Sequence, residues 1–193
     1  MNRPLHVLGI SGSLRRGSYN RGLLRAAQEV APPGMEIELY DLHGIPLYDG
    51  DVEALGDPHR VRDFKLAIDR ADAVLIATPE YNHGIPGGLK NAIDWASRPP
   101  RYSVLDGKPV AVMGATTGIG GTARAQQHLR EALAWPGAQT MPQPELLVSE
   151  AREKFELEGN LVEPETRESV RELLEALAEW TDRVRRVVAA AAA

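Results

Sequence analysis

The chain has 193 residues, with 22 basic and 27 acidic side chains, a formal net charge of −5 and no cysteine. This length suits one compact domain, so we expect residues 1–193 to form a single domain. A net negative chain has no overall electrostatic attraction to nucleic acid or to an anionic membrane. The lack of cysteine excludes disulfides, thiolate metal sites and thiol nucleophiles. Redox chemistry would therefore need a bound cofactor.

The apolar run near the amino terminus is short. It spans Leu5 to Ile10 and is followed at once by a Ser/Gly loop, which is unlike a signal peptide. No run approaches the roughly 18 apolar residues that a membrane span needs. We therefore expect a cytoplasmic protein with no membrane insertion, no nucleic-acid partner and no metal site.

Short apolar runs alternate with amphipathic stretches along the chain. Strands are predicted over 5–10, 35–40, 73–78, 109–115 and 145–148. Helices are predicted over 20–31, 61–70, 87–97 and 122–133, and along an apolar stripe from Val170 to Val188. Strands that are apolar on both faces and alternate with helices indicate a parallel sheet covered on both sides. The predicted fold is a doubly wound α/β sandwich, which binds ligands at the carboxyl ends of its strands.

The first loop, residues 11–20, reads SGSLRRGSYN between a strand and a helix. Free N–H groups at a helix start, glycines, hydroxyls and a guanidinium together favour a phosphate ligand. A Walker A site is excluded because Ser18 and Tyr19 stand where Lys and Ser or Thr are needed, and the GxGxxG spacing also fails. The serines alone could be turn and cap formers. Arg15 and Asn20 favour a bound monophosphate over that alternative.

Two more loops follow later strands. Residues 79–88 read PEYNHGIPGG, a stiff segment with glycines where a ligand can approach the backbone. A flat isoalloxazine ring suits such a loop, since Tyr81 could face the ring while backbone groups meet its edge. Residues 116–121 read TTGIGG, and their N–H groups would stabilise charge on a reduced ring. Each feature alone has a simpler explanation. His83 could be a solvated or capping side chain, Tyr81 a core or interface aromatic, and residues 116–121 a glycine turn.

Three segments together resemble the NAD(P)H-dependent FMN reductase family, which includes bacterial quinone, chromate and azo reductases. They are GISGSLRRGSYN at 9–20, PEYNHGIPGGLKNAIDW at 79–95 and GGTARAQQHLR at 120–130. The likeness extends over nearly the whole chain. It implies a flavodoxin-like three-layer sandwich with a five-stranded parallel sheet of order 2-1-3-4-5. It also implies non-covalently bound FMN, NADPH or NADH as electron donor, and a homodimer or homotetramer.

The resemblance also implies a set of cofactor-binding residues. Those around the FMN phosphate would be Ser11, Ser13, Arg15, Ser18 and Asn20. Those bordering the ring and ribityl chain would be Pro79, Glu80, Tyr81 and Asn82, with Thr116, Thr117 and Gly118 at the other edge. Candidates for contact with a 2′-phosphate are Arg16, Arg98 and Arg101, and candidates for a subunit interface are Arg124 and Glu145. No catalytic acid or base is predicted, because the flavin carries the chemistry.

The activity that this resemblance implies is a ping-pong oxidoreduction. NAD(P)H would deliver hydride to the flavin N5 and leave before an acceptor of the quinone, chromate, azo or flavin type binds. An alternative is a flavodoxin-like one-electron carrier, although the aromatic sandwich of flavodoxins is not evident in these loops. A third possibility is a flavin-binding sensor or structural subunit without turnover.

Overall fold

A computed structural model describes residues 3–191, so residues 1, 2, 192 and 193 of the predicted domain lie outside the described residues. The strands are β1 (Leu5–Ser11), β2 (Met35–Tyr40), β3 (Ala73–Ala77), β4 (Pro109–Ala115), β5 (Gln139–Thr140) and β6 (Leu146–Val148). Every strand pairing is parallel, in the order β2-β1-β3-β4-β5, and β6 also pairs with β4. The predicted parallel sheet and its 2-1-3-4-5 order are confirmed.

The fifth position of the sheet differs from the prediction. The strand predicted at 145–148 is β6, which pairs with the end of β4, whereas the unpredicted β5 pairs with the start of β4. The sheet thus has six strands in the described part of the chain, not five. Pro142 and Pro144 lie between β5 and β6, and proline has no N–H to donate to a ladder, so the segment leaves the sheet there. A strand of two residues is too short to show a periodicity.

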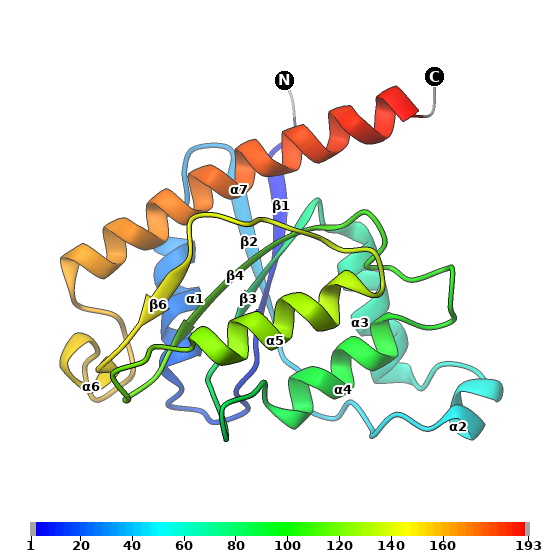
Figure 1. The fold of residues 1–193 in the computed structure, drawn as a ribbon, viewed down its shortest axis with the longest axis horizontal. Helices are drawn as coiled ribbons and strands as arrows, with labels where there is room; N and C mark the ends of the chain where they lie inside the picture. Colours follow the sequence, from blue (N-terminus) through cyan, green and yellow to red (C-terminus); the bar gives the residue numbers. More distant parts are fainter. Residues whose placement is uncertain (1–2, 192–193) are drawn as a thin grey trace.

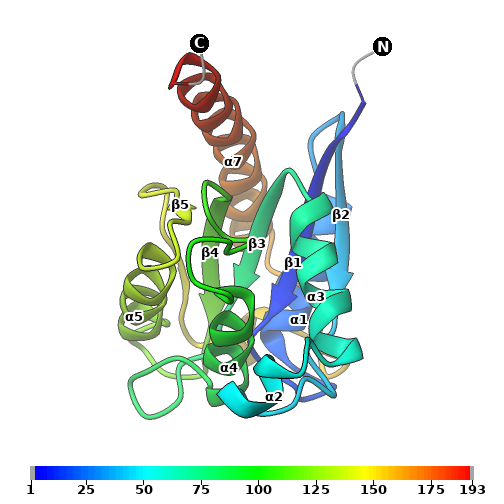
Figure 2. The same ribbon diagram turned by 90° about the vertical axis from the view of Figure 1, so that its right-hand side faces the viewer.

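Helices cover both faces of the sheet (Figures 1 and 2). One face carries α1 (Tyr19–Glu29) and α7 (Pro164–Ala191), and the other carries α3 (His59–Arg70), α4 (Gly87–Ala96) and α5 (Ala123–Ala134). The short helices α2 (Gly50–Ala54) and α6 (Ala151–Lys154) were not predicted, since one turn leaves little periodic signal. Helix α7 continues past the end of the sheet (Figure 2). Within residues 3–191, no helix is long and apolar enough to cross a bilayer.

Alternate residues of β1 enter two separate cores. Val7 packs with α1 and α7, whereas Leu8 and Ile10 pack with the helices on the opposite face. On that opposite face Trp95 is fully buried, and its indole N–H donates to the carbonyl oxygen of Pro46 at 2.9 Å. This double burial makes the sheet a rigid frame for the loops at its carboxyl ends.

Candidate functional site

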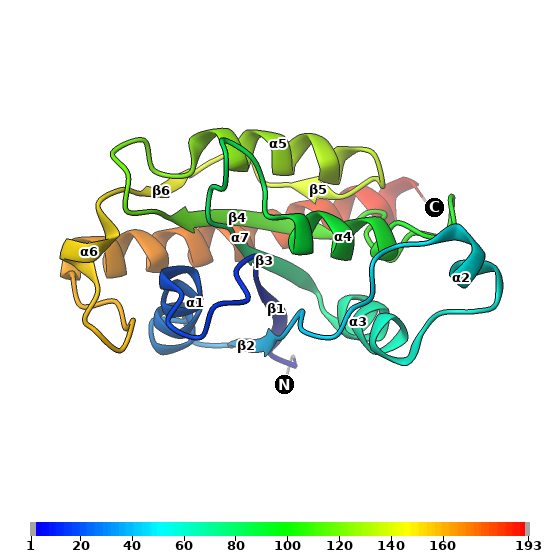
Figure 3. The ribbon, with the colours of Figure 1, turned by 90° about the horizontal axis from the view of Figure 1, so that it is seen from below.

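The loops after β1, β3 and β4 meet at one edge of the sheet, the lower edge in Figure 1, which Figure 3 views from below. We call residues 11–20, 79–88 and 116–121 the carboxyl edge. The hydroxyls of Ser13 and Tyr81 lie 3.3 Å apart and join the first two loops. The Asn20 amide donates to the carbonyl oxygen of Ala115 at 2.9 Å and joins the first loop to β4. The three loops therefore lie together at the carboxyl ends of the strands, where the predicted fold binds ligands.

Glycine at position 114 allows the second and third loops to approach each other. A Cβ atom there would overlap the Thr122 hydroxyl and the carbonyl oxygen of Thr78. Because both neighbours are held in place, a side chain at position 114 would push the loops apart. The close meeting of the loops thus depends on a residue inside β4 that carries no chemistry of its own.

Serines shape the first loop. Ser18 caps α1, its hydroxyl oxygen accepting from the N–H groups of Asn20 at 3.2 Å and Arg21 at 3.4 Å. The Ser11 hydroxyl oxygen accepts from the N–H of Ser13 at 3.2 Å. The serines are therefore turn and cap formers, as the alternative interpretation held. The Ser11 hydroxyl also donates to the carbonyl oxygen of Ser13 at 3.2 Å. Among the described residues the Ser18 hydroxyl only accepts, so it can still donate its own proton to a ligand.

The same loop has spare hydrogen-bond donors. Among residues 3–191, the backbone N–H groups of Leu14, Arg16 and Gly17 form no hydrogen bond. The Arg15 side chain is exposed, with its guanidinium carbon 5.6 Å from the centre of the Tyr19 ring. Free N–H groups, hydroxyls and a guanidinium beside a helix start are the donor set that a phosphate monoester needs. The residues present thus fit the phosphate of a mononucleotide.

The side chain of Asn20 has a structural role that the sequence did not reveal. Its amide donates to the carbonyl oxygen of Ala115, while its own oxygen accepts from the Ala115 N–H, both at 2.9 Å. The residue is only 2% exposed. Asn20 therefore fixes the start of α1 against the end of β4, and its contribution to a phosphate site is to position the loop.

The second loop contains a tight turn at residues 81–84. The N–H of Tyr81 donates to the carbonyl oxygen of Gly84, and the Gly84 N–H donates back to Tyr81, both at 3.0 Å. Asn82 and His83, the central residues, have positive φ angles of 51° and 61°, the conformation of a type I′ turn. Tyr81 remains 52% exposed at the base of this turn. It is thus available to a flat ligand at the carboxyl edge.

The carboxylate of Glu80 is bound to the start of α5. It accepts from the N–H of Ala125 at 3.1 Å and lies 3.4 Å from the Nδ1 atom of His83. The Arg124 guanidinium lies 2.7 Å from the same Nδ1 atom. Because a guanidinium only donates, the Nδ1 atom is the acceptor in this contact. Glu80 therefore holds the second loop against the start of α5. Its place beside the ring stays a prediction.

The third loop is braced by a segment that the sequence did not connect with it. The N–H of Thr116 donates to the carbonyl oxygen of Val148 at 3.0 Å, and the N–H of Ala151 donates to Thr116 at 3.0 Å. These bonds fasten the loop to β6 and α6. Thr117 and Gly118 stay exposed. The Gly118 N–H donates to the Thr116 hydroxyl at 3.4 Å and its carbonyl oxygen accepts from the Glu150 N–H at 3.3 Å, so within the described chain only the Thr117 N–H of this pair has no partner.

A cavity of about 160 Å³ lies beside Ser11 and is lined by residues of α1 and of the end of β2, including Arg21 and Asp41. Partial burial raises the pKa of Asp41, but hydrogen bonds from His43 and Arg21 outweigh it and lower this pKa to about 2. The carboxylate is therefore charged at neutral pH and pairs with Arg21 at 3.0 Å. No sequence pattern marks this pair, because α1 and β2 meet only in the folded chain.

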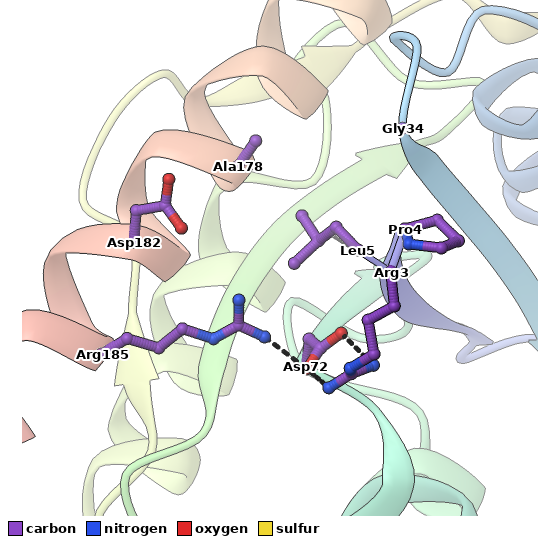
Figure 4. Close-up of a pocket in the computed structure, with 8 residues that line it drawn as sticks. All are labelled: Arg3, Pro4, Leu5, Gly34, Asp72, Ala178, Asp182 and Arg185. Carbon is purple, nitrogen blue, oxygen red and sulfur yellow. Dashed lines mark hydrogen bonds and ion pairs between the residues drawn. The ribbon is translucent and has the colours of Figure 1, made fainter. Parts of the chain in front are cut away.

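A larger cavity, of about 610 Å³, lies at the opposite end of the sheet (Figure 4). It is lined by Arg3, Pro4, Leu5, Gly34, Asp72, Ala178, Asp182 and Arg185, which we call the amino edge. The Asp72 carboxylate there pairs with Arg3 at 2.6 Å and with Arg185, and accepts from the N–H of His6 at 2.9 Å. The Asp72 charge is thus paired, whereas the first loop of the carboxyl edge keeps donors without a partner among the described residues. Donor chemistry, not cavity volume, therefore identifies the candidate site.

Comparison with known proteins shows the family to which the chain belongs. The profile of the family described as NADPH-dependent FMN reductase matches residues 5–153. An NAD(P)H-dependent FMN reductase of Pseudomonas aeruginosa is 50% identical over 96% of this chain and 100% of its own length. A quinone reductase of Escherichia coli is 40% identical over 96% and 100%, respectively.

A solved structure gives the same result. The flavoenzyme NAD(P)H:(acceptor) oxidoreductase FerB of Paracoccus denitrificans superimposes with a TM-score of 0.84 at 35% identity, covering 92% of this chain and 97% of that one. The predicted resemblance and the flavodoxin-like fold are both confirmed. The chain therefore belongs to the NADPH-dependent FMN reductase family, which makes it an oxidoreductase with FMN as cofactor and NAD(P)H as electron donor.

Proposed function

We propose that the carboxyl edge binds FMN and that the chain passes electrons from NAD(P)H to quinone-type acceptors. The observation that carries this proposal is the set of free donors in the first loop, namely the N–H groups of Leu14, Arg16 and Gly17 beside the Arg15 guanidinium. A phosphate monoester would satisfy these donors together. The quinone reductase named above supports the choice of acceptor.

Each loop has a separate part in this proposal. The hydroxyls of Ser11, Ser13 and Ser18 would hold the phosphate together with Arg15, while Asn20 keeps the loop in register with β4. Residues that would border the ring are Pro79, Glu80, Tyr81, Asn82, Thr116, Thr117 and Gly118. When bound, FMN supplies the hydride-accepting chemistry that a chain without cysteine lacks. The exposed N–H groups of the third loop would favour negative charge at the ring edge.

We further propose a ping-pong order, in which NAD(P)H leaves before the acceptor enters. Tyr81 is 52% exposed and Ile119 is 88% exposed, so the carboxyl edge is open to solvent. This openness supports the proposed order, because two molecules could then use the same site in turn. Such an open site would also admit chromate, azo compounds and free flavin as acceptors. A single domain over residues 1–193, a homodimer or homotetramer, and a cytoplasmic location remain predictions.

An anaerobic titration tests this function. NADPH added to the FMN-loaded protein should bleach its yellow colour in one two-electron step, and a benzoquinone should then restore it. A protein that binds no FMN, and is therefore colourless once free FMN has been removed, would contradict the proposal. A long-lived blue one-electron state would favour the flavodoxin-like carrier, and bleaching without turnover would favour a sensor or structural subunit.

A further inference from the structure

The segment between α6 and α7 forms a small hairpin outside the carboxyl edge. Phe155 and Leu161 pair as an antiparallel bridge, and both side chains are buried. Inside it, the N–H of Glu156 donates to the carbonyl oxygen of Asn160 at 3.0 Å, and the N–H of Gly159 donates to Glu156 at 2.9 Å. Residues 155–161, which we call the hairpin, thus have a defined conformation of their own.

The hairpin is fastened to the first turns of α1. The Arg25 guanidinium donates to the carbonyl oxygen of Gly159 at 2.8 Å and to the side-chain oxygen of Asn160 at 2.9 Å. A Cβ atom at Gly22 would overlap the same Gly159 carbonyl oxygen and lie 3.0 Å from the Phe155 ring. Only glycine at position 22 lets the hairpin approach the helix this closely. The contact is therefore built into the sequence of α1.

Two routes lead from the hairpin to the phosphate-binding loop. Gly159 lies against the loop itself, since a Cβ atom placed on it would be 3.7 Å from the carbonyl carbon of Gly17. In addition, the Phe155 ring packs on Tyr19 with 5.0 Å between ring centres, and the Tyr19 ring lies under the Arg15 guanidinium. The hairpin thus supports both a residue with a free N–H and the cation of the loop.

We propose that the hairpin holds residues 11–20 in the conformation that binds a phosphate monoester, and that Arg25 is a positioning residue for that loop. This proposal rests on the proposed function of the carboxyl edge. The hairpin carries Glu156 and Glu158 and no cation, so it cannot attract a phosphate itself. It acts by keeping the donors of the loop preorganised, which reduces the ordering cost of binding.

The replacement Arg25→Ala tests the proposal, because it removes both hydrogen bonds to the hairpin and leaves every proposed phosphate donor in place. We expect the Kd for FMN to rise roughly ten-fold. The Kd for riboflavin, which lacks the phosphate, should change less than about two-fold. Arg25→Lys keeps one donor and should recover part of the FMN affinity. Quenching of flavin fluorescence measures both ligands, at a temperature where each variant is fully folded by circular dichroism.

Arg167→Ala is a matched control. Arg167 also joins the base of the hairpin to α1, through Glu29 at 2.8 Å and the carbonyl oxygen of Leu161 at 3.3 Å, away from the Gly159 contact. It should leave the affinity ratio of FMN to riboflavin unchanged. If Arg25→Ala loses affinity for FMN and riboflavin equally, or loses none, the proposed role of the hairpin is overturned and the proposed function is not. A wild-type chain that binds no FMN would overturn this role together with the proposed function.

Discussion

The two ends of the sheet use polar groups in opposite ways. At the amino edge, the side chain of Asp72 is 7% exposed and is bound by Arg3, Arg185 and the N–H of His6, beside a cavity of about 610 Å³. The first loop of the carboxyl edge, in contrast, contains no carboxylate that could pair with its donors. Its free N–H groups therefore remain available to a ligand. The amino edge therefore fastens the start of β1 and helix α7 to the sheet (Figure 4), whereas the first loop of the carboxyl edge keeps donors without a partner among the described residues.

This contrast shows why the size of a cavity is a poor guide to function. Charged groups that already pair with one another lose that interaction when a ligand enters, so the amino edge offers little net gain. Unpaired donors held by a rigid frame gain a full interaction from an anion. Substitutions at the carboxyl edge should therefore change the affinity for FMN, and substitutions at the amino edge should change the free energy of unfolding.

The largest expected effect is on cofactor affinity at the carboxyl edge. Arg15→Ala should raise the Kd for FMN by roughly 10- to 100-fold, because a charge-assisted hydrogen bond to phosphate contributes about 1.5–3 kcal/mol. The free energy of unfolding without cofactor should hardly change, since Arg15 is exposed. Fluorescence titration and urea unfolding measure the two quantities. The matched control, Arg3→Ala at the amino edge, should leave the Kd unchanged; a similar rise there would break the contrast.

The reverse effect is expected at the amino edge. Asp72→Asn should lower the free energy of unfolding by about 1–2 kcal/mol, because two arginines and a backbone N–H lose their charged acceptor. The Kd for FMN should not change in the folded fraction. Urea unfolding with and without FMN measures this, and a loss of affinity at constant stability would contradict it.

The contribution of Asp72 should also depend on pH. Burial raises the pKa of Asp72, but the His6 N–H, Arg3 and Arg185 outweigh this and lower it below the ordinary value of 3.8. A carboxyl whose pKa is lowered by folding stabilises the folded state above its unfolded pKa and loses that contribution as the pH falls through its folded pKa. The stability difference between wild type and Asp72→Asn should therefore be full at pH 7 and shrink below pH 3.8. A constant difference down to pH 2, seen in urea unfolding, would contradict this.

The smallest expected effect concerns the link between the first two loops. Tyr81→Phe removes the hydroxyl that lies 3.3 Å from the Ser13 hydroxyl and keeps the ring. The Kd for FMN should rise about two- to five-fold, since one neutral hydrogen bond contributes about 0.5–1 kcal/mol. Tyr48→Phe, which removes a hydroxyl bound to Glu53 outside the carboxyl edge, is the control in the same titration. Equal effects of the two would mean that the Tyr81 hydroxyl has no local role.

The elements with clear apolar runs could be predicted from the sequence, including β6, whereas β5, α2 and α6 could not. Strand β3, AVLIA, is buried at every residue and was found within one residue of its end. Strand β5 and helices α2 and α6 are too short to show a period. The fold therefore follows from hydrophobic patterning, and the edge of the sheet at β5 and β6 follows from tertiary pairing.

The candidate site shows the same division. A loop rich in Ser, Gly and Arg after a buried strand predicts anion binding from residue chemistry alone. The bond between Asn20 and Ala115, the cap that Glu80 provides for α5, and the contact of the hairpin with Gly22 join residues distant in sequence. No local pattern marks such contacts, so the supports of the site became visible only in the folded chain.

A crystal structure of the chain grown with FMN would test the central claim most directly. We expect the phosphate group within hydrogen-bond distance of the N–H groups of Arg16 and Gly17 and of the Ser18 hydroxyl, with the ring beside Tyr81. Flavin bound in the cavity between Arg3, Asp72 and Arg185, or side chains of the chain itself filling the space above residues 11–20, would contradict the account.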